Sequence, residues 1–226
     1  MQQMLLKWGP RLIWPLILLT IALLLIFSLV RVADILGWLP PPVEGQPGPP
    51  PEFNVRYLDH VVLSLWHVIT GFIFIILAPL QFSKSWRAKH LVMHRWVGRG
   101  LISVALIAAV TGIVMAYELP GFGGFSSTLA SWTLGLTIII CLLRALWCAV
   151  TRQIALHREW MLRAFAIGLA VGTQRLLISI FMGFQAAPFE EIFAPTLWLG
   201  LVLNLIIVET WITLTRLSPR KGNNPS

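Results

Sequence analysis

The sequence has few charged residues for its length. Of its 226 residues, 12% are Asp, Glu, Lys or Arg, whereas about a quarter are charged in a typical soluble domain. Apolar residues make up 57% of the chain, and the mean hydropathy is +0.80. This composition excludes an ordinary soluble domain and is typical of an integral membrane protein.

The sequence also lacks the common catalytic motifs. It contains no phosphate-binding loop, no HExxH zinc motif, no GxSxG nucleophile motif and no cysteine spacing typical of zinc sites. Its two cysteines, Cys141 and Cys148, are seven residues apart on one apolar run. A helix separates such positions by about 10 Å, which is too far for a disulfide. We therefore expect both cysteines to be small core residues.

Long apolar runs are abundant. Runs of about twenty apolar residues can each cross a bilayer as a helix. Six are present, at 11–31, 58–80, 96–117, 127–149, 160–182 and 194–215. The predicted fold is an all-α integral membrane protein with six transmembrane helices. Spans two to five form a four-helix core, to which an N-terminal and a C-terminal helix are added.

Proline divides the chain into unequal parts. The segment WLPPPVEGQPGPPPEF follows the first span and cannot be helical. We expect an N-terminal transmembrane helix at 1–38, a Pro-rich outer linker at 39–57, a five-helix bundle at 58–216 and a basic tail at 217–226. In this organisation the first helix is a semi-independent addition to the bundle.

The net charge of +8 comes from basic residues gathered between alternate spans. Placing both termini in the cytoplasm puts every basic cluster on the cytoplasmic side, as the positive-inside rule requires. The predicted location is the bacterial inner membrane, and the predicted partner is the lipid bilayer. Nucleic-acid binding is not expected, because the basic residues do not form one patch. They are Lys7, Arg11, Lys84, Arg87, Lys89, Arg95, Arg152, Arg158, Arg216, Arg220 and Lys221.

Two His-Arg pairs lie at the start of the third and fifth spans. His94 and His157 each begin a stripe of small residues at helical spacing, so both should face the bundle interior at one level. Two imidazoles from different helices can supply the axial ligands of a haem b. Nearby arginines could neutralise its propionates, namely Arg95, Arg99, Arg158 and Arg163. Histidine and arginine at a helix entrance are also common interfacial residues, and this alternative stays open.

A second polar level is expected nearer the opposite ends of the helices. His67 on the second span and Arg175 on the fifth lie at similar depth, with Gln174 adjacent. Ionisable side chains within a span are usually paired or functional. These three residues predict a site for a quinone or another small polar ligand. By the same depth argument, Arg144 and Glu209 are expected to form a structural ion pair.

A set of short motifs lies within residues 60–180. They are His67-x-x-x-Gly71, Pro79-x-Gln81-Phe82, His94-Arg95-x-x-Gly98-Arg99, Trp132, His157-Arg158-x-Trp160-Met161-x-Arg163 and Arg175-Leu176. Together these motifs resemble a widespread bacterial family of predicted membrane proteins, DUF2306, catalogued as a domain of unknown function. The resemblance implies a multi-helix membrane fold and supplies no activity.

A looser likeness is to the transmembrane di-haem cytochromes b that pass electrons from ascorbate. That family holds one haem between its first and third core helices and another between its second and fourth. His94 and His157 fall on the second and fourth core helices here. The third core helix, which is the fourth span, has no histidine. The resemblance therefore implies at most one haem.

These patterns lead to one preferred hypothesis and two rivals. We expect a redox protein that binds one haem b or a quinone-like ligand inside the bundle. The first rival is a non-redox carrier or sensor for a small polar or anionic solute; it is less favoured because no inverted repeat and no broken helix are expected. The second rival is a structural membrane subunit. Whether the protein is an enzyme is left open.

Overall fold

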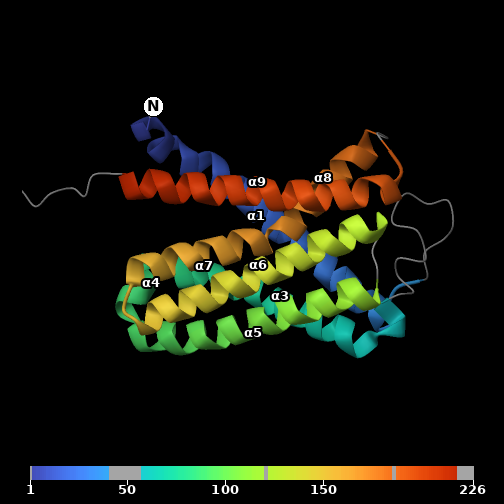
Figure 1. Cartoon of the computed structure of the whole chain (residues 1–226), viewed down its shortest axis with the longest axis horizontal. Helices are drawn as coiled ribbons and strands as arrows, with labels where there is room; N and C mark the ends of the chain where they lie inside the picture. The colour runs from blue at the N-terminus through green and yellow to red at the C-terminus, as the bar shows by residue number, and fades with distance from the viewer. Residues whose placement is uncertain (1, 41–56, 120–121, 185–186, 218–226) are drawn as a thin grey trace, which may run out of the picture.

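The computed structural model describes residues 2–40, 57–119, 122–184 and 187–217, with side chains from Trp14 onward. Within these ranges there are helices and no strands. The helices are α1 (Gln2–Ile35), α3 (Val61–Phe82), α4 (Lys84–Lys89), α5 (Leu91–Glu118), α6 (Gly124–Val150), α7 (Ile154–Gly168), α8 (Ala170–Gly183) and α9 (Phe189–Leu217) (Figure 1). Most of the expected linker and basic tail lies outside the described residues.

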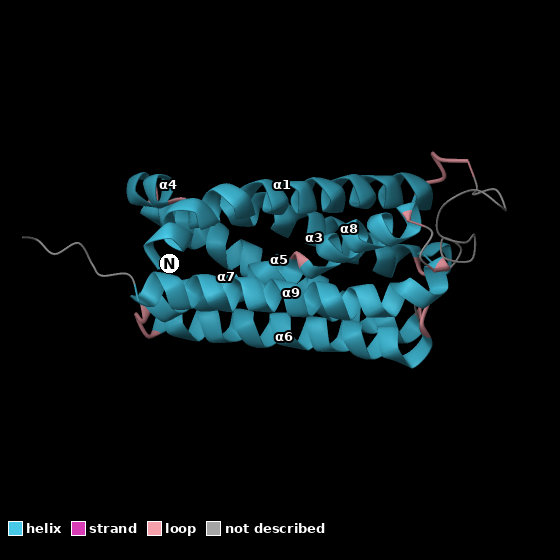
Figure 2. Cartoon of the chain, turned by 90° about the horizontal axis from the view of Figure 1, so that it is seen from above, coloured by secondary structure: helices cyan, strands magenta, loops and turns pink. Residues whose placement is uncertain are grey.

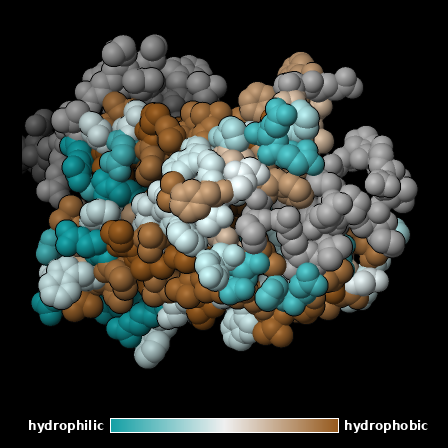
Figure 3. Space-filling view, turned by 45° about the vertical axis from the view of Figure 1, so that its right-hand side comes forward, coloured by the Kyte–Doolittle hydropathy of each residue, from teal (hydrophilic) through white to brown (hydrophobic). Residues whose placement is uncertain are grey.

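Six helical stretches are long and apolar enough to cross a membrane, and each overlaps a predicted span. They are Trp14–Ile35, Val61–Phe82, Leu91–Glu118, Gly124–Val150, Ile154–Gly183 and Phe189–Arg216. Many large apolar side chains on them are exposed, as expected for helices that contact lipid. Figure 3 shows apolar residues over much of one face, with hydrophilic residues in separate patches. The all-helical membrane fold is therefore confirmed.

Helices α5, α6 and α9 run roughly along one axis (Figure 2), whereas α1 crosses them obliquely (Figure 1). The first turn of α1, helix α4 and the last turn of α9 lie at the same end of the molecule (Figure 1). We call this the basic end, because it contains Lys84, Arg87, Lys89 and Arg95. The opposite end contains the turn between α5 and α6.

The core lies among α3, α5, α6 and α7, the four helices expected to form it. Adjacent pairs in this order pack along their lengths, and α3 also touches α7. Small residues let the helices approach closely, since association in lipid relies on packing rather than on the hydrophobic effect. The central buried residues include Ala78, Ala105, Leu142 and Ala164, and both cysteines are buried and unbonded, as expected.

The fifth span, Ile154–Gly183, bends at Leu169, and we call this point the break. The α-helical bonds run on across it, from Leu169 N to the Phe165 carbonyl and from Thr173 N to the Leu169 carbonyl, each 3.0 Å. Helix α7 ends at Gly168 and α8 begins at Ala170, with Leu169 between them at φ −73° and ψ −12°. Helix α8 leaves the line of α7 and packs beside α9 (Figure 1). Helix α9 packs closely against α8 at the break. Gly200 of α9 permits this contact, since a Cβ there would lie 2.6 Å from the Ala170 carbonyl oxygen. Asn204 adds a 2.7 Å hydrogen bond from its Nδ2 to Thr173 Oγ1.

Helix α1 packs against α3 and α8 rather than standing apart from the bundle. A Cβ on Gly172 of α8 would lie 2.6 Å from the methyl group of Thr20. This glycine therefore allows the two helices to approach closely, and Thr20 is buried. The semi-independent first helix expected from the Pro-rich segment is replaced by a helix that forms one wall of the bundle.

Candidate functional site

A cavity of about 340 Å³ lies where α8 departs from the four-helix core. Residues of α1, α3, α5, α6, α8 and α9 line it, and most of them are apolar or glycine. We call it the His67 cavity. It brings together the three side chains that the sequence placed at one polar level: His67, Gln174 and Arg175.

The His67 imidazole is held at a fixed position in this cavity. Its Nδ1 lies 2.9 Å from the carbonyl oxygen of Ala108 on α5. A carbonyl only accepts hydrogen bonds, so Nδ1 carries the proton and Nε2 of the neutral ring is left as an acceptor. Gly112 provides the room, since a Cβ there would lie 2.9 Å from His67 Cε1.

Gln174 and Arg175 reach the cavity from α8. The Gln174 side chain is buried and donates a 3.0 Å hydrogen bond from Nε2 to the carbonyl oxygen of Phe193 on α9. The Arg175 guanidinium lies 5.7 Å from the ring centroid of Phe27 on α1. The break at Leu169 therefore directs two polar side chains toward a space walled by α1 and α3.

Two further polar residues of the cavity, Arg31 and Tyr57, were not proposed from the sequence. Arg31 ends the first apolar run, and Tyr57 lies at the edge of the Pro-rich segment. The Arg31 Cζ lies 4.1 Å from the Tyr57 ring centroid, and its Nη1 lies 2.7 Å from an oxygen of Asp34. Both residues interact electrostatically with Arg175. Asp34 balances the charge of Arg31, whereas the Arg175 guanidinium can donate to a ligand that carries hydrogen-bond acceptors or negative charge.

The basic end holds the second expected level. His157 on α7 is fixed by a 2.8 Å hydrogen bond between its Nδ1 and the carbonyl oxygen of Ala145 on α6. His94 on α5 interacts electrostatically with His157, Arg87 and Arg95. Both histidines thus lie at the basic end, and neither lines the His67 cavity.

The arginines at this end differ in their availability. Arg95, Arg99 and Arg158 are exposed, and the Arg99 Cζ lies 5.1 Å from the Trp96 ring centroid. Arg163 is already paired, since its Nε and Nη2 donate to the two carboxylate oxygens of Glu209 at 2.5 and 2.9 Å. Its charge is thus committed to α9 and is a poor match for a haem propionate.

The expected pair between Arg144 and Glu209 is wrong. Helix α7 packs against both α6 and α9, so Arg163 of α7 reaches Glu209 on α9. Arg144 is exposed on α6, and its Cζ lies 5.7 Å from the Trp160 ring centroid. Glu159 extends the ion network by contacting Arg163 at 3.8 Å and bonding Arg216.

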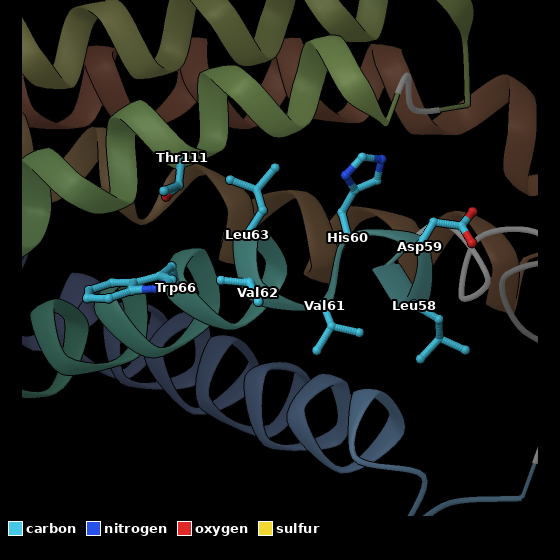
Figure 4. A pocket seen from close by; sticks show the side chains of 8 residues that line it. All are labelled: Leu58, Asp59, His60, Val61, Val62, Leu63, Trp66 and Thr111. Carbon is cyan, nitrogen blue, oxygen red and sulfur yellow. The ribbon is translucent and has the colours of Figure 1, made fainter.

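A second hollow is a surface groove rather than an enclosed site. It is lined by Asp59, His60, Thr111 and several exposed apolar residues near the start of α3. In Figure 4, Leu63 and His60 project toward the side of α5 that carries Thr111, whereas Val61 and Leu58 point away. Its open, mainly apolar walls are typical of a surface covered by lipid. Among the residues that the structure describes, no group of three or more His, Cys, Asp or Glu is placed to hold a metal ion.

Comparison with known proteins gives one match. A family model described as a predicted membrane protein, DUF2306, matches residues 64–212, which is more than half of the chain. The match contains His67, His94, His157 and Arg175. No curated protein and no solved structure matches significantly. The looser likeness to di-haem cytochromes b therefore gains no support from these comparisons.

Proposed function

Because the chain belongs to the DUF2306 family of predicted membrane proteins, whose function is unknown, we propose a function from the site itself: a membrane redox protein that binds a quinone-class ligand in the His67 cavity. The observation that carries this proposal is one cavity, within apolar walls, that joins His67, Gln174 and Arg175. Its polar groups occupy part of the lining, and the remainder suits an apolar ring or tail.

The size and chemistry of the cavity support a ligand of this class. Small-molecule sites typically measure about 300–1,000 Å³ and combine apolar walls with a few polar groups. The His67 cavity, at about 340 Å³, lies at the lower end of that range. A quinone head group fits the donors and acceptors. Arg175 can donate to a ring carbonyl, and His67 Nε2 can accept the hydroxyl proton of the reduced form.

A titration with decylubiquinone tests this proposal. Purified protein in detergent is expected to bind it, and Gly71→Leu should raise the Kd at least about tenfold, or about 1.4 kcal/mol. Gly71 lines the cavity, and an added Cβ there meets no atom within 4 Å, so the larger side chain fills space without a clash at its base. Gly100→Leu is the matched control, since Gly100 is exposed on α5 and equally unobstructed. Equal binding by both variants, or none by the wild type, would contradict the proposal.

The same redox role would include one haem b at the basic end, held by His94 and His157. His157 supports this assignment, because its Nδ1 is bonded to a carbonyl and its Nε2 is left for a metal. Haem-ligating histidines commonly have such a second partner. The exposed Arg95, Arg99 and Arg158 would contact the propionates.

An absorption spectrum after haem-supplemented expression tests the haem assignment. The wild type is expected to show a Soret band that His94→Ala and His157→Ala both lose. His90→Ala should keep it, since His90 is exposed at the same end of the molecule. The absence of a Soret band in the wild type would contradict the haem assignment. The quinone proposal would then depend on the decylubiquinone titration alone.

The break beside the cavity favours a second candidate function, a carrier or sensor for a small anionic solute. Transporters often form their substrate sites at discontinuous helices, and Gly168 and Val171 on either side of Leu169 line the His67 cavity. If this function holds, acetate, lactate or phosphate should raise the thermal stability of the wild type and not of Arg175→Ala. Decylubiquinone would then leave the stability unchanged.

The proposed location is the bacterial inner membrane, with the basic end in the cytoplasm. The His67 cavity would then lie in the outer half of the bilayer and the two histidines of the basic end near its inner surface.

A further inference from the structure

Three buried side-chain polar atoms lack a hydrogen-bond partner in the described part of the chain, and they belong to two residues near the basic end. They are Oε1 and Nε2 of Gln81 and Nδ1 of His94. Buried polar groups in proteins are nearly always paired. Their concentration in two residues at the basic end therefore indicates a function for this pair.

The two side chains come from neighbouring helices that pack together. Gln81 is at the end of α3 and is only 9% exposed. Its Oε1 lies 3.7 Å from the position of a Cβ on Gly98, one helical turn after His94 on α5. Trp86 of α4 covers the His94 ring, with centroids 6.3 Å apart. Gln81 thus approaches α5 one helical turn from His94.

His157 illustrates the effect of a hydrogen-bond partner on the Nδ1 of a histidine ring. Its Nδ1 is bonded to the Ala145 carbonyl, so the ring orientation is fixed and Nε2 is the free nitrogen. His94 has the same inward-facing Nδ1 but no carbonyl partner. A glutamine side chain offers an equivalent carbonyl oxygen, which can accept the proton of an imidazole Nδ1.

We propose that Gln81 is the positioning residue of His94. Its Oε1 accepts the proton of His94 Nδ1, which fixes the tautomer and leaves the lone pair of Nε2 for a ligand between α5 and α7. The purpose of this hydrogen bond rests on the proposed haem site, whereas the bond itself can be measured in the ligand-free protein. Gln81 would then be to His94 what the Ala145 carbonyl is to His157.

Nitrogen-15 NMR of histidine-labelled, haem-free protein in nanodiscs tests the bond directly. The His94 signals are assigned by their loss in His94→Ala. The wild type is expected to show His94 protonated at Nδ1, with an unprotonated Nε2. Gln81→Leu should shift both signals toward the opposite tautomer, and Gln81→Glu, whose carboxylate also accepts, should keep the wild-type pattern.

Thr70→Val is the matched control. Thr70 is another buried polar residue of α3, but its hydroxyl bonds to carbonyls of its own helix. It should leave the His94 signals unchanged. Protonation of His94 at Nε2 in the wild type, or signals that do not move in Gln81→Leu, would overturn the inference.

In haem-loaded protein, Gln81→Glu should lower the midpoint potential relative to Gln81→Leu, because a stronger acceptor makes the imidazole a stronger electron donor. Equal potentials would contradict the positioning role even where haem binds. If the wild type takes up no haem, only the haem assignment is wrong. The tautomer measurement then decides whether Gln81 positions His94.

Discussion

His67 is held in its cavity by hydrogen bonds at Nδ1, to the Ala108 carbonyl and the Thr111 hydroxyl, and by the missing side chain of Gly112. The bond to the Ala108 carbonyl orients the ring, and Gly112 leaves the space that the ring fills. The two features act together, since a Cβ at position 112 would lie only 2.9 Å from Cε1 of the ring that the hydrogen bond orients. The position of His67 Nε2, the acceptor nitrogen of the site, therefore depends on Gly112 of α5.

Gly112→Ala is expected to displace the His67 ring and to lower stability by about 1–3 kcal/mol, the usual effect of overpacking. The temperature of thermal unfolding in detergent and the affinity for decylubiquinone should both fall. Gly100→Ala is the control, because Gly100 lies outside the cavity lining and its added Cβ meets no atom within 4 Å. Equal stability of the two variants would show that His67 can move without loss.

Glu209 joins α9 to α7 through Arg163, and its side chain is 49% exposed. A double-mutant cycle with Arg163→Gln and Glu209→Gln is expected to give a coupling of about 0.2–1 kcal/mol, typical of an exposed pair. The same cycle with Arg144→Gln should give a coupling near zero. A larger coupling to Arg144, measured by the same unfolding assay, would restore the pair expected from the sequence.

At the scale of the helices, the break at Leu169 creates the site. Helix α8 turns away to pack on α9, and the cavity occupies the space between α8 and the other core helices. Gly200 permits this packing by bringing α9 onto the Ala170 carbonyl. Asn204 secures it through Thr173.

Gly200→Ala should therefore separate α8 from α9 and reduce stability by about 1–3 kcal/mol, because a backbone oxygen at 2.6 Å cannot easily move aside. Ligand binding in the cavity should weaken as well. Gly183→Ala at the end of α8 is the control, since nothing lies within 4 Å of its added Cβ. Unchanged thermal unfolding of Gly200→Ala would mean that the break does not depend on α9.

The sequence was informative about depth and helix faces, and much less so about bends. Apolar length predicted the six spans, and similar depth grouped His67, Gln174 and Arg175, which line one cavity. The break at Leu169 involves no proline and depends on packing against α9, which no local pattern reveals. The pair between Arg144 and Glu209 failed because equal depth does not determine which neighbouring helix a side chain faces. Gln81 belonged to one of the short motifs of the sequence, but only its lack of partners in the structure drew attention to it.

At the scale of the whole molecule, the first turn of α1 and the last turn of α9 lie at the basic end (Figure 1). If that end is cytoplasmic, a green fluorescent protein fused after Ser226 should fluoresce in bacterial cells, and alkaline phosphatase at the same position should be inactive. Active phosphatase at that position would reverse the orientation. The His67 cavity would then lie in the cytoplasmic half of the bilayer.

The most direct measurement is native mass spectrometry of the protein released from bacterial membranes. The account predicts a bound species whose added mass equals that of a membrane quinone, retained by Gly100→Leu and absent from Gly71→Leu. A wild-type protein that carries no quinone and takes up no added decylubiquinone would contradict it.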